Sequence, residues 1–230
     1  MAYFGEALDR AVSLILSGDR ELFTIVTTSL KISLTAVLIA ALPAILLGLM
    51  IGLNPFPGKR LLRHLLGTLM AMPTVGIGLL LYGLFSRSGP FGSWGWLYTQ
   101  KAMVAGQTLL VTPLMIHWIS SSAGQLDPRL KPTLMALGAN PFQRLLWIVR
   151  EMWTAIVAAL VAAFGRAIGE VGAAMMLGGN IAGFTRTMTT AIALETSKGQ
   201  FELGLALGMV LLLVAFLVNS VVVWLRGEGL

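Results

Sequence analysis

The sequence predicts an all-α integral membrane protein with about five transmembrane helices and an amphipathic helix at its N-terminus. Three observations predict this fold class: the composition, the spacing of the uncharged stretches and the pattern of the first residues. Of 230 residues, 57% are hydrophobic and 11% are charged, with a mean hydropathy of +0.85. Soluble domains carry about 25% charged residues, and disordered chains are rich in charge and poor in apolar residues. The composition therefore excludes both classes.

Uncharged stretches locate the helices that cross the membrane. Four of them contain no Asp, Glu, Lys or Arg, and each can cross about 30 Å of hydrocarbon at about 1.5 Å per residue. They cover residues 32–58, 65–86, 102–126 and 203–225. A fifth predicted span, residues 153–176, is apolar and rich in small residues but contains Arg166 and Glu170. Five spans place the two termini on opposite sides of the membrane.

The first residues follow a different pattern. Apolar residues recur at helical spacing from Phe4 to Leu16, and most of the charged residues lie between them. This pattern is typical of an amphipathic helix that lies in the membrane interface. We therefore expect an interfacial helix over residues 1–21, a membrane domain over residues 22–226 and a short cytoplasmic tail over residues 227–230.

The basic residues indicate the orientation, because cytoplasmic loops carry an excess of Lys and Arg. Lys59, Arg60 and Arg63 lie close together without an acidic neighbour. We therefore place the N-terminus outside, the C-terminus inside, and residues 54–64 and 127–151 in the cytoplasm. Basic loops beside a membrane also account for the net charge of +6. We expect no nucleic-acid partner, which would need basic residues clustered on one exposed face.

No pattern in the sequence predicts a catalytic or metal site. A phosphate-binding loop of the GxxxxGK[ST] type is missing, so this chain does not hydrolyse ATP by that route. His117 lies near Ser120, Ser121 and Ser122, but the sequence has no GxSxG and no HExxH pattern. A membrane-embedded enzyme stays an alternative, which would need clustered acids or a Ser–His pair on facing spans.

The segment of residues 127–151 is too long and too polar for a simple turn between two spans. Gly138 indicates the end of one short helix, and Asn140 followed by Pro141 indicates the start of another. Apolar residues recur along the segment. A cytoplasmic helix with exposed apolar residues predicts a partner protein.

This segment resembles the cytoplasmic coupling loop of ABC-importer permeases. Leu137-Gly138-Ala139 is similar to the glycine core of that loop, whereas Pro132-Thr133-Leu134 stands where the family has Glu-Ala-Ala. The resemblance implies contact with an ATPase that uses ATP and Mg, while this chain itself binds no cofactor. The residues that it assigns to ATPase coupling are Leu134, Leu137, Gly138, Ala139, Asn140, Pro141 and Phe142.

The next stretch resembles the oxyanion branch of those permeases, which carries molybdate, tungstate or sulfate. Residues 164–173 read FGRAIGEVGA, and residues 181–201 continue in a pattern most similar to the tungstate type. The resemblance covers roughly residues 20–226. It implies the type I ABC importer fold and a homodimer in the plasma membrane of a prokaryote. The other partners it implies are two ATPase subunits and an extracytoplasmic oxyanion-binding protein.

Arg166 and Glu170 are the first candidates for the transport pathway. Arg166 lies about 20 Å along its helix from Trp153, where a lone arginine costs at least about 2.5–3.5 kcal/mol. Glu170 falls on the same helical face one turn further and can pair with it. Two interpretations stay open: a pair that locks helix packing, or a pathway-lining cation that eases the passage of a dianion.

The predicted outer loop, residues 178–200, is rich in hydrogen-bond donors that suit a tetrahedral oxyanion. The candidates are Asn180, Thr185, Arg186 and Thr187. We expect this loop to contact a binding protein or to form the outer gate rather than to hold the anion. A membrane potential of 100 mV opposes dianion entry by about 4.6 kcal/mol. Inward transport therefore needs the partner ATPase.

Overall fold

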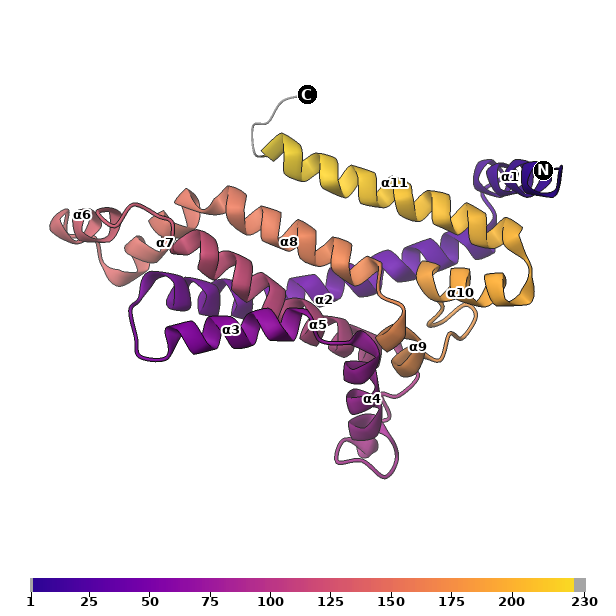
Figure 1. The fold of residues 1–230 in the computed structure, drawn as a ribbon, viewed down its shortest axis with the longest axis horizontal. Helices are drawn as coiled ribbons and strands as arrows, with labels where there is room; N and C mark the ends of the chain where they lie inside the picture. The colour runs from indigo at the N-terminus through magenta and orange to yellow at the C-terminus, as the bar shows by residue number, and fades with distance from the viewer. Residues whose placement is uncertain (1, 226–230) are drawn as a thin grey trace.

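The computed structural model describes residues 2–225, within which all regular structure is helical (Figure 1). The predicted tail, residues 227–230, lies outside the described residues. The helices are α1 (Ala2–Leu16), α2 (Arg20–Leu53), α3 (Lys59–Met70), α4 (Thr74–Phe85), α5 (Gln100–Ala123), α6 (Leu130–Ala136), α7 (Pro141–Glu151), α8 (Trp153–Ile168), α9 (Gly172–Gly178), α10 (Met188–Lys198) and α11 (Phe201–Leu225), with a short 3-10 helix, η1 (Gly92–Trp94).

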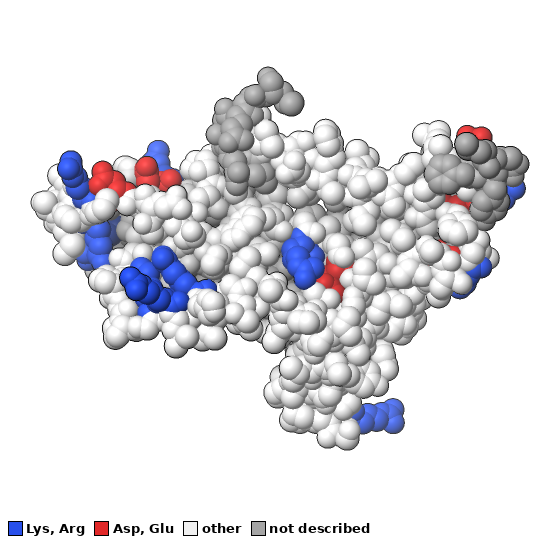
Figure 2. Space-filling view, viewed as in Figure 1, with Lys and Arg blue, Asp and Glu red and all other residues white. Residues whose placement is uncertain are grey.

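Long apolar helices run along the long axis of the molecule. By length and composition α2, α5 and α11 can each cross a membrane, and two bent helix pairs, α3–α4 and α7–α8, raise the number to as many as five. Figure 1 shows α6 and α7 at one end of the molecule and α1 and α10 at the other. On the face drawn in Figure 2, charged side chains gather mainly toward these two ends, and the surface between them is mostly uncharged.

The first two helices are separated by a break at residues 17–19. Gly18 adopts a positive φ of 70°, and the Asp19 side chain accepts a hydrogen bond from the Leu22 backbone N–H at 2.8 Å. The break thus lies slightly before the boundary at residue 21 that we predicted. Helix α1 buries Ala7 and Ala11 and leaves Leu8, among other apolar residues, exposed. This exposed apolar stripe suits a helix at the membrane interface.

Helix α2 is longer than the predicted span of residues 32–58. It begins at Arg20 and ends at Leu53. The predicted span begins after Lys31, because this span is predicted from a stretch that contains no charged residue. A cap at Asp19 begins the helix instead, and Lys31 lies well inside it. At the other end, two prolines in Asn54-Pro55-Phe56-Pro57 prevent the helix from continuing.

The second predicted span, residues 65–86, is wrong as a single helix. Helices α3 and α4 meet at an angle of 90° around residues 71–73. Pro73 has no N–H to continue the hydrogen-bond ladder of α3, and it disfavours a helical conformation at Met72. In Figure 1, α4 runs across the direction of the long helices and lies beside α9.

The span predicted over residues 153–176 is also two helices. Helix α8 ends at Ile168, and α9 begins at Gly172. The predicted outer loop likewise contains a helix, α10, that the sequence pattern did not indicate. In contrast, the predicted spans 102–126 and 203–225 correspond closely to α5 and α11.

The core of the molecule is the contact between α2 and α5. Gly48 and Gly52 of α2 face α5, where a Cβ at Gly48 would lie 2.7 Å from Ile119 Cγ2 and a Cβ at Gly52 would lie 2.9 Å from the Ser120 carbonyl oxygen. Ala163 and other small residues of α8 complete this core. Small residues thus let three helices approach closely.

We expect Gly52→Ala to destabilise the protein by about 1–3 kcal/mol, because the added methyl group overpacks the contact between α2 and α5. Gly208→Ala on α11 is the matched control, since a Cβ there meets nothing within 4 Å. That substitution should be neutral or slightly stabilising, because alanine favours helix over glycine. Thermal unfolding of the purified variants in detergent measures the difference. Equal stability of the two variants would contradict the packing described here.

Candidate functional site

The break between α8 and α9 is organised by the side chain of Glu170. This residue is 3% exposed. Its Oε1 accepts a hydrogen bond from the Ala173 backbone N–H at 2.9 Å, at the start of α9, and its Oε2 lies 3.5 Å from Arg166 Nη1 on α8. We had placed Glu170 on the same helix as Arg166. The structure instead places it after the end of α8, where it still pairs with Arg166.

The two members of this pair have different surroundings. The Glu170 side chain is 2% exposed and has a second, shorter hydrogen bond, whereas the Arg166 side chain is 40% exposed. At 3.5 Å the ion pair is long for a charge-assisted hydrogen bond, which is about 2.7–2.9 Å. Glu170 is therefore held by the protein, and the Arg166 guanidinium is largely available to the space beside it.

Two further polar side chains hold the break together, and each lies on a different helix. Thr189 Oγ1 of α10 donates to the Glu170 backbone oxygen at 2.6 Å. Gln107 Nε2 of α5 donates to the Ala167 carbonyl oxygen at 3.1 Å, near the end of α8. The end of α8 leaves backbone oxygens without their usual helical partners. Thr189 supplies a partner for Glu170, and the Ala167 carbonyl oxygen accepts from the Glu170 N–H at 3.2 Å as well as from Gln107.

Helix α9 packs directly against α4, so the two interrupted spans meet. A Cβ at Gly78 would lie 2.9 Å from Ala173 Cα, and a Cβ at Gly172 would lie 2.7 Å from Val75 Cγ2. The bends at residues 71–73 and 169–171 therefore belong to one contact region. Interrupted helices inside a membrane occur where the protein buries the freed backbone groups or lines a watery cavity.

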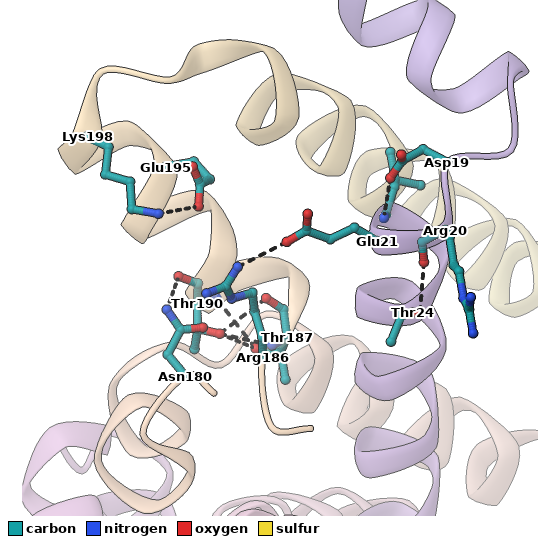
Figure 3. A network of polar contacts seen from close by, with 11 residues as sticks. Asp19, Arg20, Glu21, Thr24, Asn180, Arg186, Thr187, Thr190, Glu195 and Lys198 are labelled. Carbon is teal, nitrogen blue, oxygen red and sulfur yellow. Dashed lines mark hydrogen bonds and ion pairs between the residues drawn. The ribbon is translucent and has the colours of Figure 1, made fainter. Parts of the chain in front are cut away.

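The hydroxyl groups of the outer segment, residues 178–187, form hydrogen bonds within the protein (Figure 3). Thr185 Oγ1 donates to the Gly178 carbonyl oxygen at 2.6 Å and accepts from the Ile181 N–H at 3.0 Å. Thr187 caps α10 in a capping box with Thr190. Asn180 Nδ2 donates to the Thr190 carbonyl oxygen at 3.3 Å. These side chains stabilise the outer segment itself.

Arg186 ties the outer segment to α2. Its Nη1 forms an ion pair with Glu21 Oε1 at 3.1 Å, and its side chain is 14% exposed (Figure 3). A second tie lies nearby, where the Met188 N–H donates to Ser29 Oγ at 2.7 Å. The predicted candidates thus form two groups with separate partners: Arg166 with Glu170, and Arg186 with the N-terminal part of α2.

The segment of residues 127–151 has the predicted form. Helix α6 ends at Ala136, and Gly138 follows with a φ of 77°. The Gly138 N–H donates to the Met135 carbonyl oxygen and the Ala139 N–H to the Leu134 carbonyl oxygen, each at 3.0 Å, which is a Schellman motif. Asn140 then begins α7 in a capping box with Gln143.

This segment has one buried side and one exposed apolar side. Leu134, Ile148 and Met152 are buried in a cluster with residues of α2, α5 and α8. Leu137 is 77% exposed and Phe142 is 70% exposed. Such large exposed apolar side chains at one end of the molecule are typical of a surface that another protein covers.

A polar cavity of about 480 Å³ lies beside the start of α8 and the end of α5. It is lined by His117, Trp118, Ser121, Ser122, Thr154, Ala155 and Ala158. Ser120 Oγ donates to the His117 backbone oxygen rather than to its ring. An acidic side chain that could orient the imidazole is not part of this lining. The cavity therefore does not present the triad that a hydrolase needs.

Comparison with known proteins decides the family. The family model described as binding-protein-dependent transport system inner membrane component matches residues 44–227. The chain belongs to this family. The type I ABC importer fold and the resemblance to ABC-importer permeases are thereby confirmed, and the chain is a transport subunit rather than an enzyme.

Several relatives of this transport subunit are named for oxyanions. The tungstate uptake system permease protein TupB of Peptoclostridium acidaminophilum is 40% identical over 99% of this chain and 100% of its own length. TupB of Campylobacter jejuni is 35% identical over 95% of this chain and 92% of its own length. The molybdenum transport system permease protein ModB of Escherichia coli is 29% identical over 83% of this chain and 90% of its own length.

Sequence reasoning did not identify Gln107, Ser29 or Glu195 as part of the polar framework. Gln107 is 3% exposed, and Glu195 of α10 is 4% exposed and pairs with Lys198 at 3.1 Å. A glutamine inside an otherwise apolar span was a usable signal, since buried polar groups need partners. The burial of Glu195 had no such signal, because α10 was taken as a loop.

We expect Thr189→Val to destabilise the protein by about 1–3 kcal/mol, because it leaves the buried Glu170 carbonyl oxygen without a partner. Thr24→Val on α2 is the control: its hydroxyl is exposed and bonds to the Arg20 carbonyl oxygen of its own helix. The control should change stability by less than about 0.5 kcal/mol. Thermal unfolding in detergent compares the two, and a larger loss in Thr24→Val would refute the role given to Thr189.

Proposed function

We propose that this chain is the permease subunit of an ATP-driven importer that carries tungstate into the cell by alternating access. The observation that carries the proposal is a partly exposed Arg166 at the junction of two interrupted spans. The names of the relatives that match almost the whole chain, TupB of two bacteria, support tungstate as the substrate. Relatives named for molybdate and sulfate are less similar, at 24–29% identity, and supply the second candidates.

Arg166 suits a dianionic substrate for an electrostatic reason. A guanidinium that is 40% exposed beside a fixed carboxylate offers several N–H donors that the protein does not use fully. A tetrahedral oxyanion that passes near it would exchange water for charge-assisted hydrogen bonds. Glu170 keeps the arginine in place between substrates.

The proposed energy source is a separate ATPase. Dianion entry against 100 mV costs about 4.6 kcal/mol, and this chain has no phosphate-binding loop of the Walker type. The exposed side chains of Leu137 and Phe142 supply a surface for such a partner. We assign the coupling residues Leu134, Leu137, Gly138, Ala139, Asn140, Pro141 and Phe142 to this contact. The chain itself is proposed to bind no cofactor, since ATP and Mg belong to the partner.

The proposed assembly contains two copies of this chain, two ATPase subunits and an extracytoplasmic binding protein in the plasma membrane of a prokaryote. Helix α4 supports a homodimer, because it carries exposed apolar residues such as Leu79 and Leu80. The excess of basic residues around α3 supports a cytoplasmic position for the end that carries α6 and α7. The N-terminus is then outside and the C-terminus inside.

We expect the assembled transporter, reconstituted in vesicles with its binding protein, to take up tungstate when ATP is supplied on the side of the membrane that corresponds to the cytoplasm. Arg166→Ala should lower uptake at least about tenfold, because a charge-assisted contact contributes about 1.5–3 kcal/mol. Arg166→Lys should recover part of it. The readout is accumulated radioactive tungstate, with molybdate and sulfate as competitors.

The control for this experiment is Arg10→Ala, which removes an exposed ion pair with Glu202 at the surface. It should leave uptake unchanged, since exposed pairs contribute little. If Arg166→Ala assembles normally and transports at the wild-type rate, the pathway role is wrong. If sulfate suppresses the uptake of radioactive tungstate at a lower concentration than unlabelled tungstate does, the substrate assignment is wrong.

We expect the double variant Leu137→Ser/Phe142→Ser to lose co-purification with the ATPase while the permease still folds, because both side chains are exposed. Leu16→Ser on α1 is a matched control, since Leu16 is 81% exposed at the opposite end of the molecule. Affinity purification of the tagged permease followed by quantification of bound ATPase tests this. Retention of the ATPase by the double variant would place the contact elsewhere.

A further inference from the structure

A groove of about 860 Å³ lies between α2 and α5, apart from the Arg166 site. Lys31 of α2 and Lys101 of α5 lie at one end of it, and Leu109 and Thr112 of α5 lie at the other. The two helices run in parallel: Thr108 Oγ1 donates to the Ala36 carbonyl oxygen, and further along both helices Gly52 lies against Ser120. The same register places Lys31 within about one helical turn of Lys101.

Both lysines are uncompensated. Their side chains are exposed and form no ion pair or side-chain hydrogen bond with the residues that the structure describes. Two neighbouring ammonium groups repel each other. An anion seated between Lys31 and Lys101 would remove this repulsion.

The rest of the groove is apolar. Ile32, Ile39, Val104 and Leu109 contribute its walls. The three threonines that also line it use their hydroxyls elsewhere: each donates to a backbone carbonyl oxygen at 2.6–3.3 Å. The groove below the lysines therefore offers little to a small hydrated anion and suits a hydrocarbon chain.

The length of the groove matches one leaflet of a bilayer. From Lys101 to Thr112 the α5 axis rises about 16 Å at 1.5 Å per residue, and half of the hydrocarbon thickness is about 15 Å. The lysines thus lie at headgroup level when the apolar part lies at acyl-chain level. We propose that this groove binds one anionic phospholipid, with its phosphate between Lys31 and Lys101 and an acyl chain along α5.

The lipid belongs to the leaflet on the side of α1 and α10, because both lysines lie near the end of α5 that faces those helices. Its acyl chain would cover the surface between α2 and α5 that faces the lipid. This site is independent of the transported substrate, since neither its residues nor its shape involve Arg166.

Native mass spectrometry of the full chain, purified with its ATPase in a phosphate-free detergent, tests the proposal. Added phosphatidylglycerol should bind more tightly than phosphatidylcholine. Lys31→Gln/Lys101→Gln should weaken phosphatidylglycerol binding about tenfold or more, because each lysine near a phosphate headgroup strengthens binding several-fold. Arg20→Gln/Arg87→Gln is the control, since it removes the same charge from exposed positions that do not line the groove.

A second variant fills the groove and keeps the lysines. Val104→Phe should lower phosphatidylglycerol binding as well, because it occupies the acyl-chain position. Three outcomes would overturn the proposal. The first is unchanged lipid binding in the lysine variant. The second is displacement of the lipid by tungstate, which would assign the lysines to a free oxyanion. The third is a lysine variant that dissociates into single copies without losing lipid, which would assign the groove to a second copy of the chain.

Discussion

The structure depends on the way in which one buried carboxylate is satisfied. The Glu170 side chain is 2% exposed, and an unpaired charge at such a position would cost several kcal/mol. It is satisfied from two directions, by the first turn of α9 and by Arg166 at the end of α8. The backbone of the same residue is held by Thr189 of α10. Three helices, α8, α9 and α10, are therefore fixed to one another through a single residue.

The break between α8 and α9 lies beside a rigid contact between α2 and α5. Gly48 and Gly52 bring α2 and α5 so close that an added methyl group would collide with α5. Packed contacts of this kind do not deform gradually. In contrast, the two bends at residues 71–73 and 169–171 lie where the helical ladder is already interrupted. A conformational change costs least where the fewest backbone hydrogen bonds have to break, so these two bends resist it less than the continuous parts of α2 and α5 do.

Much of this architecture follows from the sequence, because the hydrocarbon layer imposes simple requirements on length and polarity. Predictions for α5, α11 and the 127–151 segment held, since Gly138 and Asn140 act locally through a positive φ and a cap. Predictions failed where boundaries were taken from charges. Lys31 lies within α2 because the cap at Asp19, and not the charge, begins that helix.

The polar candidates of the outer segment show a different limit. Residue type indicated donors at Thr185 and Thr187, but only the folded structure shows that these donors are used within the segment itself. Hydrogen bonds of this kind depend on which carbonyl groups a turn leaves unpaired, and spacing along the chain does not specify that. Arg166 stays a candidate, because a charge in a membrane segment is costly and usually faces the helix-bundle interior or a water-filled cavity.

Helix α8 links the two regions that the transport proposal requires. It begins directly after Met152, which is 3% exposed and packs in the same cluster as Leu134 and Ile148. About 20 Å further along, the same helix carries Arg166. A displacement of α7 by the proposed partner ATPase would therefore move α8 as a unit, because its helical hydrogen bonds are stronger in sum than the two side-chain contacts at its end, from Gln107 to the Ala167 carbonyl oxygen and from Arg166 to Glu170. Among the contacts that connect α7, α8 and the break after α8, the weakest is the ion pair between Arg166 and Glu170, at 3.5 Å. Motion at the coupling segment would thus first change the position of the guanidinium relative to its carboxylate, where a dianion could replace the carboxylate as its partner.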